Sequence, residues 1–186
     1  MNLYKSQVLS YIESSVPGYY HAASTTLHPL DRVQERLCRE LGISHEAALL
    51  RYKLAPLKCK RDMALLGLLH RVVFNDVSPQ LAELFPPART WPFNIATTRL
   101  QIRRHNRQLR QHAIGTETLR RSLFGLVKIY NLLPQQVIDL KSVQLFQSAL
   151  QHALSLAACR NVHYWEFLFS PRLRPVRDID FQHYFD

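Results

Sequence analysis

The stretch Leu57–Phe74, LKCKRDMALLGLLHRVVF, is the strongest amphipathic segment of the chain. Its large apolar residues recur at the spacing of one helix face, and this face consists of Leu65, Leu66, Leu68, Leu69, Val72 and Val73. The polar and charged residues Lys58, Lys60, Arg61, His70 and Arg71 lie mainly off that face. A helix with so wide an apolar face needs other helices to cover it. The segment therefore predicts an amphipathic helix with a buried face.

Helical spacing continues on the N-terminal side of this segment. Residues 2–14 are expected to form a short helix that Pro17-Gly18 stops. A second helix, 30–41, should begin after a cap at Thr26 or His28, with Pro29 in its first turn. Its apolar stripe consists of Leu30, Val33, Leu37 and Leu41, and Gly42 should end it. Ser44 then begins a third helix that reaches about residue 52.

On the C-terminal side, a short helix should start at Ser78-Pro79 and end at Pro86-Pro87. Residues 120–131 are expected to be helical, and Ser142 should cap a long helix whose buried stripe includes Phe146 and Leu150. The aromatic tail from Asn161 is expected to cover the bundle irregularly or to fray. The predicted fold class is mainly α: a small helical bundle, a basic loop and a C-terminal helical segment.

The positive charge is concentrated in one part of the chain. The net charge is +10, to which residues 1–87 contribute +2, residues 88–121 contribute +7 and residues 122–186 contribute +1. With the helix pattern, this predicts three parts: a helical bundle over 1–87, a basic loop or linker over 88–118, and a C-terminal helical segment and tail over 119–186. A chain of this charge attracts polyanions.

The arginines of the basic stretch are the first candidate nucleic-acid contacts. They are Arg99, Arg103, Arg104, Arg107, Arg110, Arg120 and Arg121. Residues 98–121 contain arginine and no lysine, which suits bidentate phosphate contacts and stacking on bases. Arg103, Arg107 and Arg110 would share a face if the segment were helical. The alternative is a solvated loop that only keeps the protein in solution.

Catalytic and metal-binding patterns are not apparent in the sequence. It has no Asp-Asp pair, and Asp178-x-Asp180 is read as surface carboxylates. Cys159-x3-His163 has no second pair at ligand spacing, so no metal and no cofactor is expected. Three widely spaced cysteines suggest reduced thiols, and no signal peptide or membrane-spanning run is seen. A nuclear or cytoplasmic location is the expectation, without membrane partners.

Three segments in the same order resemble the region after the catalytic palm in non-LTR (LINE or jockey-like) retrotransposon reverse transcriptases. Leu3–Val8 (LYKSQV) and Leu30–Arg39 (LDRVQERLCR) resemble the family's "LYKSLV" and "L-x-x-VQ-x-R-x-x-R". Residues 57–69 resemble its "L…RR…L-x-LL" helix. Ser122-Leu123-Phe124, Tyr130–Val137 (YNLLPQQV) and Ser142–Phe146 resemble its "S-F-F…WN-x-LP-x-x-V…S-x-x-x-F-K" ending, with Tyr130 in place of the usual Trp. The resemblance covers about residues 3–155.

The resemblance implies a thumb-like helical region that contacts a template–primer duplex, without the palm and its catalytic aspartates. The chain is therefore expected to be no enzyme, but a module that binds RNA or DNA without sequence preference. On this interpretation the cations that would face a duplex backbone are Arg32, Arg36, Arg39, Lys58, Lys60 and Arg61, and the alternative is that they form solvated helix faces. The competing functions are helical protein–protein interaction, including self-association through exposed apolar faces, and a remnant without function.

Overall fold

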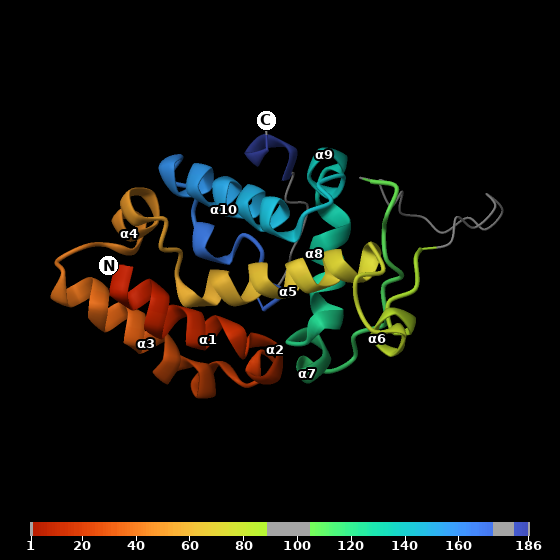
Figure 1. Ribbon diagram of the computed structural model, residues 1–186, viewed down its shortest axis with the longest axis horizontal. Helices are drawn as coiled ribbons and strands as arrows, with labels where there is room; N and C mark the ends of the chain where they lie inside the picture. The colour runs from red at the N-terminus through yellow and green to blue at the C-terminus, as the bar shows by residue number, and fades with distance from the viewer. Residues whose placement is uncertain (1, 89–104, 173–180, 186) are drawn as a thin grey trace.

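The computed structural model describes residues 2–88, 105–172 and 181–185, and is shown in Figure 1. The fold is mainly helical, as the sequence predicts. The described residues form no strand, and Pro87 and Leu109 make an isolated antiparallel bridge. The α-helices are α1 (Ser10–Ser14), α2 (Val16–Tyr19), α3 (Ser24–Glu40), α4 (His45–Tyr52), α5 (Leu57–Val73), α6 (Pro79–Glu83), α7 (Glu117–Arg120), α8 (Leu123–Leu132), α9 (Gln135–Ile138) and α10 (Val143–Cys159). A π-helix, η1 (Tyr4–Leu9), precedes α1, and 3-10 turns η2 (Trp165–Phe167) and η3 (Phe181–Tyr184) lie in the tail.

Helix α5 is the axis of the fold, as its pattern indicates. It runs through the middle of the molecule, where α10 packs on one side of it, α2 and α3 on the other, and α8 crosses it (Figure 1). Its Leu65, Leu66, Leu69 and Val72 are buried. The larger apolar cluster extends from Val16 to Phe181, so helices from the first and third predicted parts of the chain share one core.

The caps explain where several helices begin and end. Ser44 Oγ accepts a hydrogen bond from the Ala47 N–H at 3.1 Å, and Ser142 Oγ accepts one from the Leu145 N–H at 3.4 Å. Gly42, with φ of +62°, follows α3 as the sequence predicts. These observations confirm the expected starts of α4 and α10 and the expected end of α3.

The N-terminal segment differs from its prediction in two ways. Residues 4–9 form a π-helix, so Tyr4 and Leu9, five residues apart, lie on the same buried face, whereas Leu3 and Val8 are exposed. The helix ends at Ser14, as predicted, but Pro17 and Gly18 belong to a second short helix, α2, because proline fits the first turn of a helix.

Helix α3 begins earlier than predicted and buries another face. It starts at Ser24, so Pro29 lies inside it rather than in its first turn. The predicted stripe is wrong at Val33 and Leu41, which are exposed, while Leu27, Gln34 and Cys38 are buried. The Gln34 side chain can be buried because its Nε2 donates to the Ala55 carbonyl at 3.0 Å.

Candidate nucleic-acid interface

The basic stretch is described by the structure from residue 105 onward, and Asn131 of α8 fixes this part to the core. Its Oδ1 accepts the Leu109 N–H at 2.9 Å and its Nδ2 donates to the Leu109 carbonyl at 2.7 Å. Two backbone hydrogen bonds add to this: the Ala88 N–H donates to the Gln108 carbonyl and the Arg110 N–H to the Pro86 carbonyl. With Leu109 buried, this part of the basic segment has a defined position beside α6.

Arg107 is positioned by stacking rather than by an ion pair. Its guanidinium lies 4.3 Å from the centre of the Phe74 ring. Its backbone N–H donates to His105 Nδ1 at 3.2 Å, and His105 Nε2 donates to the Tyr130 carbonyl at 3.1 Å. This cation–π contact uses none of the guanidinium N–H groups as a hydrogen-bond donor to a carboxylate. The Arg107 side chain forms no hydrogen bond or ion pair with any described residue.

Arg107 and Arg110 lie in a loop, as expected for the basic stretch, and not on one helix face. Residues 105–115 contain no helix, because the segment turns at Asn106 and then pairs with residues 86–88. Arg107 and Arg110 are both exposed on this irregular segment. Arg99, Arg103 and Arg104 lie outside the described residues.

The three predicted cations of α5 face carboxylates of the same chain instead of solvent. Arg61 is 4% exposed, and its two terminal nitrogens donate to both oxygens of Asp31 at 2.7 and 3.0 Å. Lys60 pairs with Glu13 at 3.2 Å and Lys58 with Glu166. This arrangement corrects the expected duplex-facing surface. Each charge already has a partner, and Arg61 is not accessible to a phosphate.

Glu166 contacts two side chains that can carry a positive charge, Lys58 and His45. His45 Nδ1 lies 3.2 Å from Glu166 Oε1, and Lys58 Nζ also lies 4.2 Å from the centre of the Phe167 ring. The hydrogen bond from His45, followed by those from Lys58, lowers the pKa of Glu166 to about 2, and the same contact raises the pKa of His45. The Cys59 thiol donates to the Glu166 carbonyl, and burial raises its pKa well above its usual value. This cluster therefore joins α4, α5 and η2 and offers no reactive thiolate.

The last two predicted arginines share one carboxylate. Arg120 and Arg121 both pair with Glu117, one helical turn earlier, and the Arg121 Nε to Glu117 Oε1 distance is 3.0 Å. Both side chains are partly buried. The pair of ion pairs stabilises the short helix α7, so these arginines are weaker candidates for phosphate contact than Arg107 and Arg110.

Two buried polar groups of α5 hold neighbouring elements in place. His70 Nε2 donates to the Leu140 carbonyl at 2.6 Å, its Nδ1 lies 3.1 Å from the Tyr130 hydroxyl, and its ring stacks on Phe146 with a centroid distance of 4.0 Å. Burial lowers the pKa of His70 and raises that of Tyr130, so both are neutral near pH 7. The sequence interpretation placed His70 off the apolar face, whereas it is fully buried.

Asp62 is the second buried group. It accepts the Tyr20 hydroxyl at 2.6 Å and is 4% exposed. Desolvation raises its pKa from 3.8 to about 7, although Tyr20, Arg172 and Arg61 act in the opposite direction. The Arg172 guanidinium donates to the carbonyls of Tyr20 and Ala22, which ties the tail to α2.

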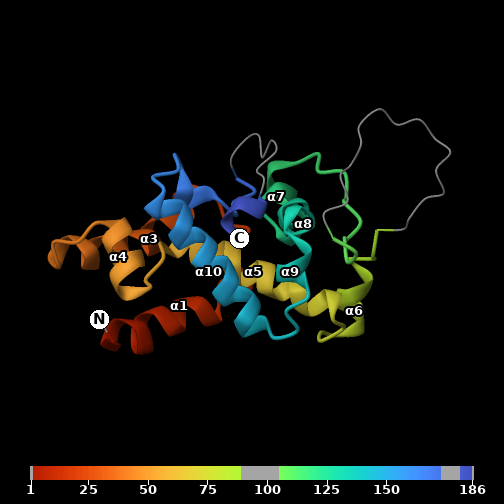
Figure 2. The same ribbon diagram turned by 90° about the horizontal axis from the view of Figure 1, so that it is seen from above.

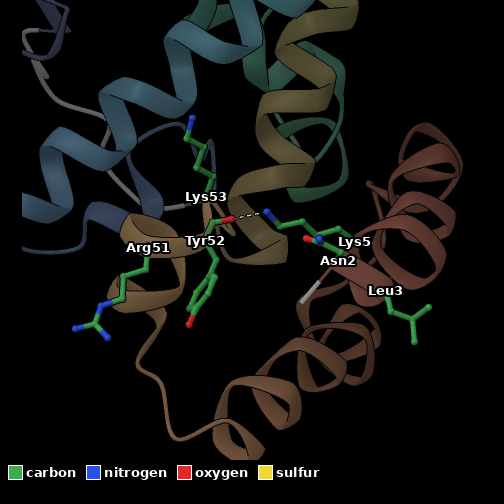
Figure 3. Close-up of a pocket in the computed structure, with 6 residues that line it drawn as sticks. All are labelled: Asn2, Leu3, Lys5, Arg51, Tyr52 and Lys53. Carbon is green, nitrogen blue, oxygen red and sulfur yellow. Dashed lines mark hydrogen bonds between the residues drawn. The ribbon is translucent and has the colours of Figure 1, made fainter.

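A groove between the start of the chain and the end of α4 was not predicted. It has a volume of about 670 Å³ and is lined by Asn2, Leu3, Lys5, Arg51, Tyr52 and Lys53. Lys5 Nζ donates to the Tyr52 carbonyl (Figure 3), and the Lys53 carbonyl accepts a hydrogen bond from Gln151 Nε2 at 2.9 Å. The available signal was the basic–aromatic–basic triplet at residues 51–53, at the end of α4.

Within the described residues, no group of three or more His, Cys, Asp or Glu side chains is placed to hold a metal ion. None of the helices in this part of the chain is long and apolar enough to cross a membrane. Comparisons with protein-family models, with curated proteins and with solved structures found no match to this chain.

Proposed function

We propose that this chain is a non-enzymatic module that contacts the phosphate backbone of RNA or DNA without sequence preference. The ancestry we propose is the helical region after the palm of a non-LTR retrotransposon reverse transcriptase, on the sequence motifs described above. The observation that carries the nucleic-acid function is Arg107. Its guanidinium lies over the Phe74 ring in an exposed segment, with no carboxylate partner among the described residues.

The arrangement around Arg107 suits a phosphodiester. A guanidinium that already rests over an aromatic ring loses less side-chain entropy when it binds a phosphate. Arg110 lies three residues away on the same anchored segment and is also exposed. Because no base-reading helix or strand is associated with these residues, the contact is to the backbone and is independent of sequence.

Binding to a labelled RNA–DNA hybrid, titrated at several salt concentrations, tests this function. If about four phosphates are neutralised, the log–log salt slope is about −3 to −4, with micromolar or weaker affinity. The variant R107Q/R110Q should weaken binding and reduce the magnitude of this slope by about 2. A salt-independent affinity, or no binding at low salt, would contradict the proposal.

The matched control is R36Q/R71Q. Arg36 pairs with Glu40 at 3.9 Å and Arg71 with Asp76 at 2.9 Å, and both arginines are exposed. This variant removes the same formal charge from positions whose cations already have partners. It should bind the hybrid nearly as the wild type does. Equal losses in the two variants would show that only net charge matters and that Arg107 and Arg110 form no site.

Self-association is the second candidate, supported by exposed apolar side chains on the first helices. Leu3 is 69% exposed and Tyr11 77% exposed, and Val8 lies between them in the sequence. Such a stripe is a typical interaction surface. Light scattering at increasing protein concentration distinguishes the candidates, because a stable oligomer that ignores nucleic acid would favour this second function.

A further inference from the structure

We propose that the groove at the end of α4 binds single-stranded nucleic acid, with an unpaired base on the Tyr52 ring and phosphates at Arg51 and Lys53. This site is distinct from the one at Arg107. The α4 groove and the segment beside α6 lie at opposite ends of the molecule, with α5 between them (Figures 1 and 2). The two sites can therefore be tested separately.

The groove is formed by a contact between distant parts of the chain. Lys5 of η1 donates to the Tyr52 carbonyl, the last residue of α4, where the helix dipole favours a cation. Lys53 follows in the left-handed conformation, with φ of 51°, and this turn directs the Arg51 and Lys53 side chains away from each other (Figure 3). The Tyr52 ring extends from the end of α4 on the same side as Arg51, whereas Lys53 points the opposite way, and Tyr52 is 40% exposed (Figure 3).

The charges of the groove distinguish it from the cations of α5. Lys5, Arg51 and Lys53 form no ion pair with the carboxylates of the described residues, and no acidic residue lines the groove. In contrast, Lys58 and Lys60, a few residues further along, each have a carboxylate opposite. Three cations gathered without acidic partners favour a polyanionic ligand.

The directions of the side chains indicate the form of that polyanion. Arg51 and Lys53 diverge, so they do not converge on one phosphate group, as a site for an inorganic anion would require (Figure 3). They suit an extended chain that crosses Tyr52 with phosphates on either side. The volume of about 670 Å³ lies in the usual range for ligand sites and leaves room for a base on the ring.

The exposed ring indicates a single strand. In a duplex the bases stack on one another and their faces are inaccessible, whereas an unpaired base can stack on an aromatic side chain. A stack of this kind does not depend on base identity, because every base has a π-face. An exposed tyrosine in a groove that Arg51 and Lys53 also line thus provides base stacking and phosphate contacts in one place.

The test measures binding of a labelled oligothymidylate and of a duplex of the same length to the full chain. Y52L should weaken oligothymidylate binding about fivefold or more and leave duplex binding unchanged, while Y52F should bind both as the wild type does. R51Q/K53Q should reduce the single-strand salt slope by about 1.4, and R36Q/R71Q should leave it nearly unchanged. Unfolding curves verify that each variant is folded.

Three results would overturn the inference. Y52L could bind oligothymidylate as tightly as the wild type, it could lose affinity for the duplex to the same extent, or poly-L-glutamate could compete as well as the oligonucleotide. The last result would assign the groove to acidic proteins instead. The function proposed for Arg107 is judged separately, because R107Q/R110Q is measured on the hybrid and leaves the groove intact.

Discussion

Replacing Asp62 with asparagine should change how the stability of the protein depends on pH. The carboxyl is buried at the Tyr20 hydroxyl, and desolvation raises its pKa from 3.8 to about 7. Between these two values the folded state binds more protons than the unfolded state, so the free energy of unfolding falls as pH rises. At about 1.4 kcal/mol for each pH unit, the full difference of about 3 pH units corresponds to about 4 kcal/mol, reached above pH 7.

Asparagine retains the acceptor for Tyr20 and resembles the neutral acid, but it cannot ionise. Chemical denaturation of both proteins should be followed at about pH 5 and about pH 8. Between these two conditions the wild type loses stability only from pH 5 up to the folded pKa of Asp62. This interval is about 2 pH units, which corresponds to about 3 kcal/mol. The stability of D62N relative to the wild type should therefore increase by about 3 kcal/mol between these conditions.

His70 acts in the opposite direction and cancels in this comparison. Its pKa is lowered by burial, so the wild type loses stability as pH falls below the ordinary histidine value of about 6.5. Both proteins contain His70, and its contribution is the same in each. A difference between D62N and the wild type that stays constant across this pH range would refute the argument, because a lost hydrogen bond alone is independent of pH.

Two further substitutions test the packing and the anchored segment. G125A should destabilise the fold by about 3 kcal/mol or more, because a Cβ at Gly125 would lie 2.0 Å from the Arg120 carbonyl oxygen. G67A should cost only about 1 kcal/mol, since its Cβ meets the far end of the flexible Gln147 side chain. Thermal or denaturant unfolding measures both losses, and equal losses would contradict this reasoning. N131A should cost about 2 kcal/mol by leaving two backbone groups without partners, and it should weaken hybrid binding although no charge is removed. Unchanged hybrid affinity in folded N131A would show that the anchored segment is not part of the interface.

The central helix and its neighbours could be predicted because their signals are local. The apolar spacing of residues 57–74, the caps at Ser44 and Ser142, and Gly42 after α3 all depend on residues within one or two turns. The π-helix could not be predicted in this way. Its buried residues Tyr4 and Leu9 are five apart, a spacing that a search for α-helical periodicity assigns to different faces.

The candidate sites could be predicted only in part, because their geometry depends on distant contacts. Arg107 was singled out by its place in a basic stretch, but its support, Phe74, is in another part of the chain. Arg61 was expected on the surface because its partner Asp31 lies on a different helix, thirty residues earlier. The groove at Tyr52 requires the first residues of the chain to meet the end of α4, which no local pattern indicates.

A cation that faces a carboxylate of the same chain has a structural role, whereas a cation without such a partner can bind a ligand. Lys58, Lys60 and Arg61 pair with acidic residues from three other segments, so they link those segments to α5. Removing such a partner leaves a partly buried charge uncompensated, which destabilises the fold and would lower any binding activity indirectly. Arg107 instead rests on an aromatic ring, and its removal leaves no orphaned carboxylate behind. In a chain with a net charge of +10, nucleic-acid binding should therefore be tested by replacing the cations that have no acidic partner. Only for these cations does a loss of affinity report a lost contact rather than a loss of stability.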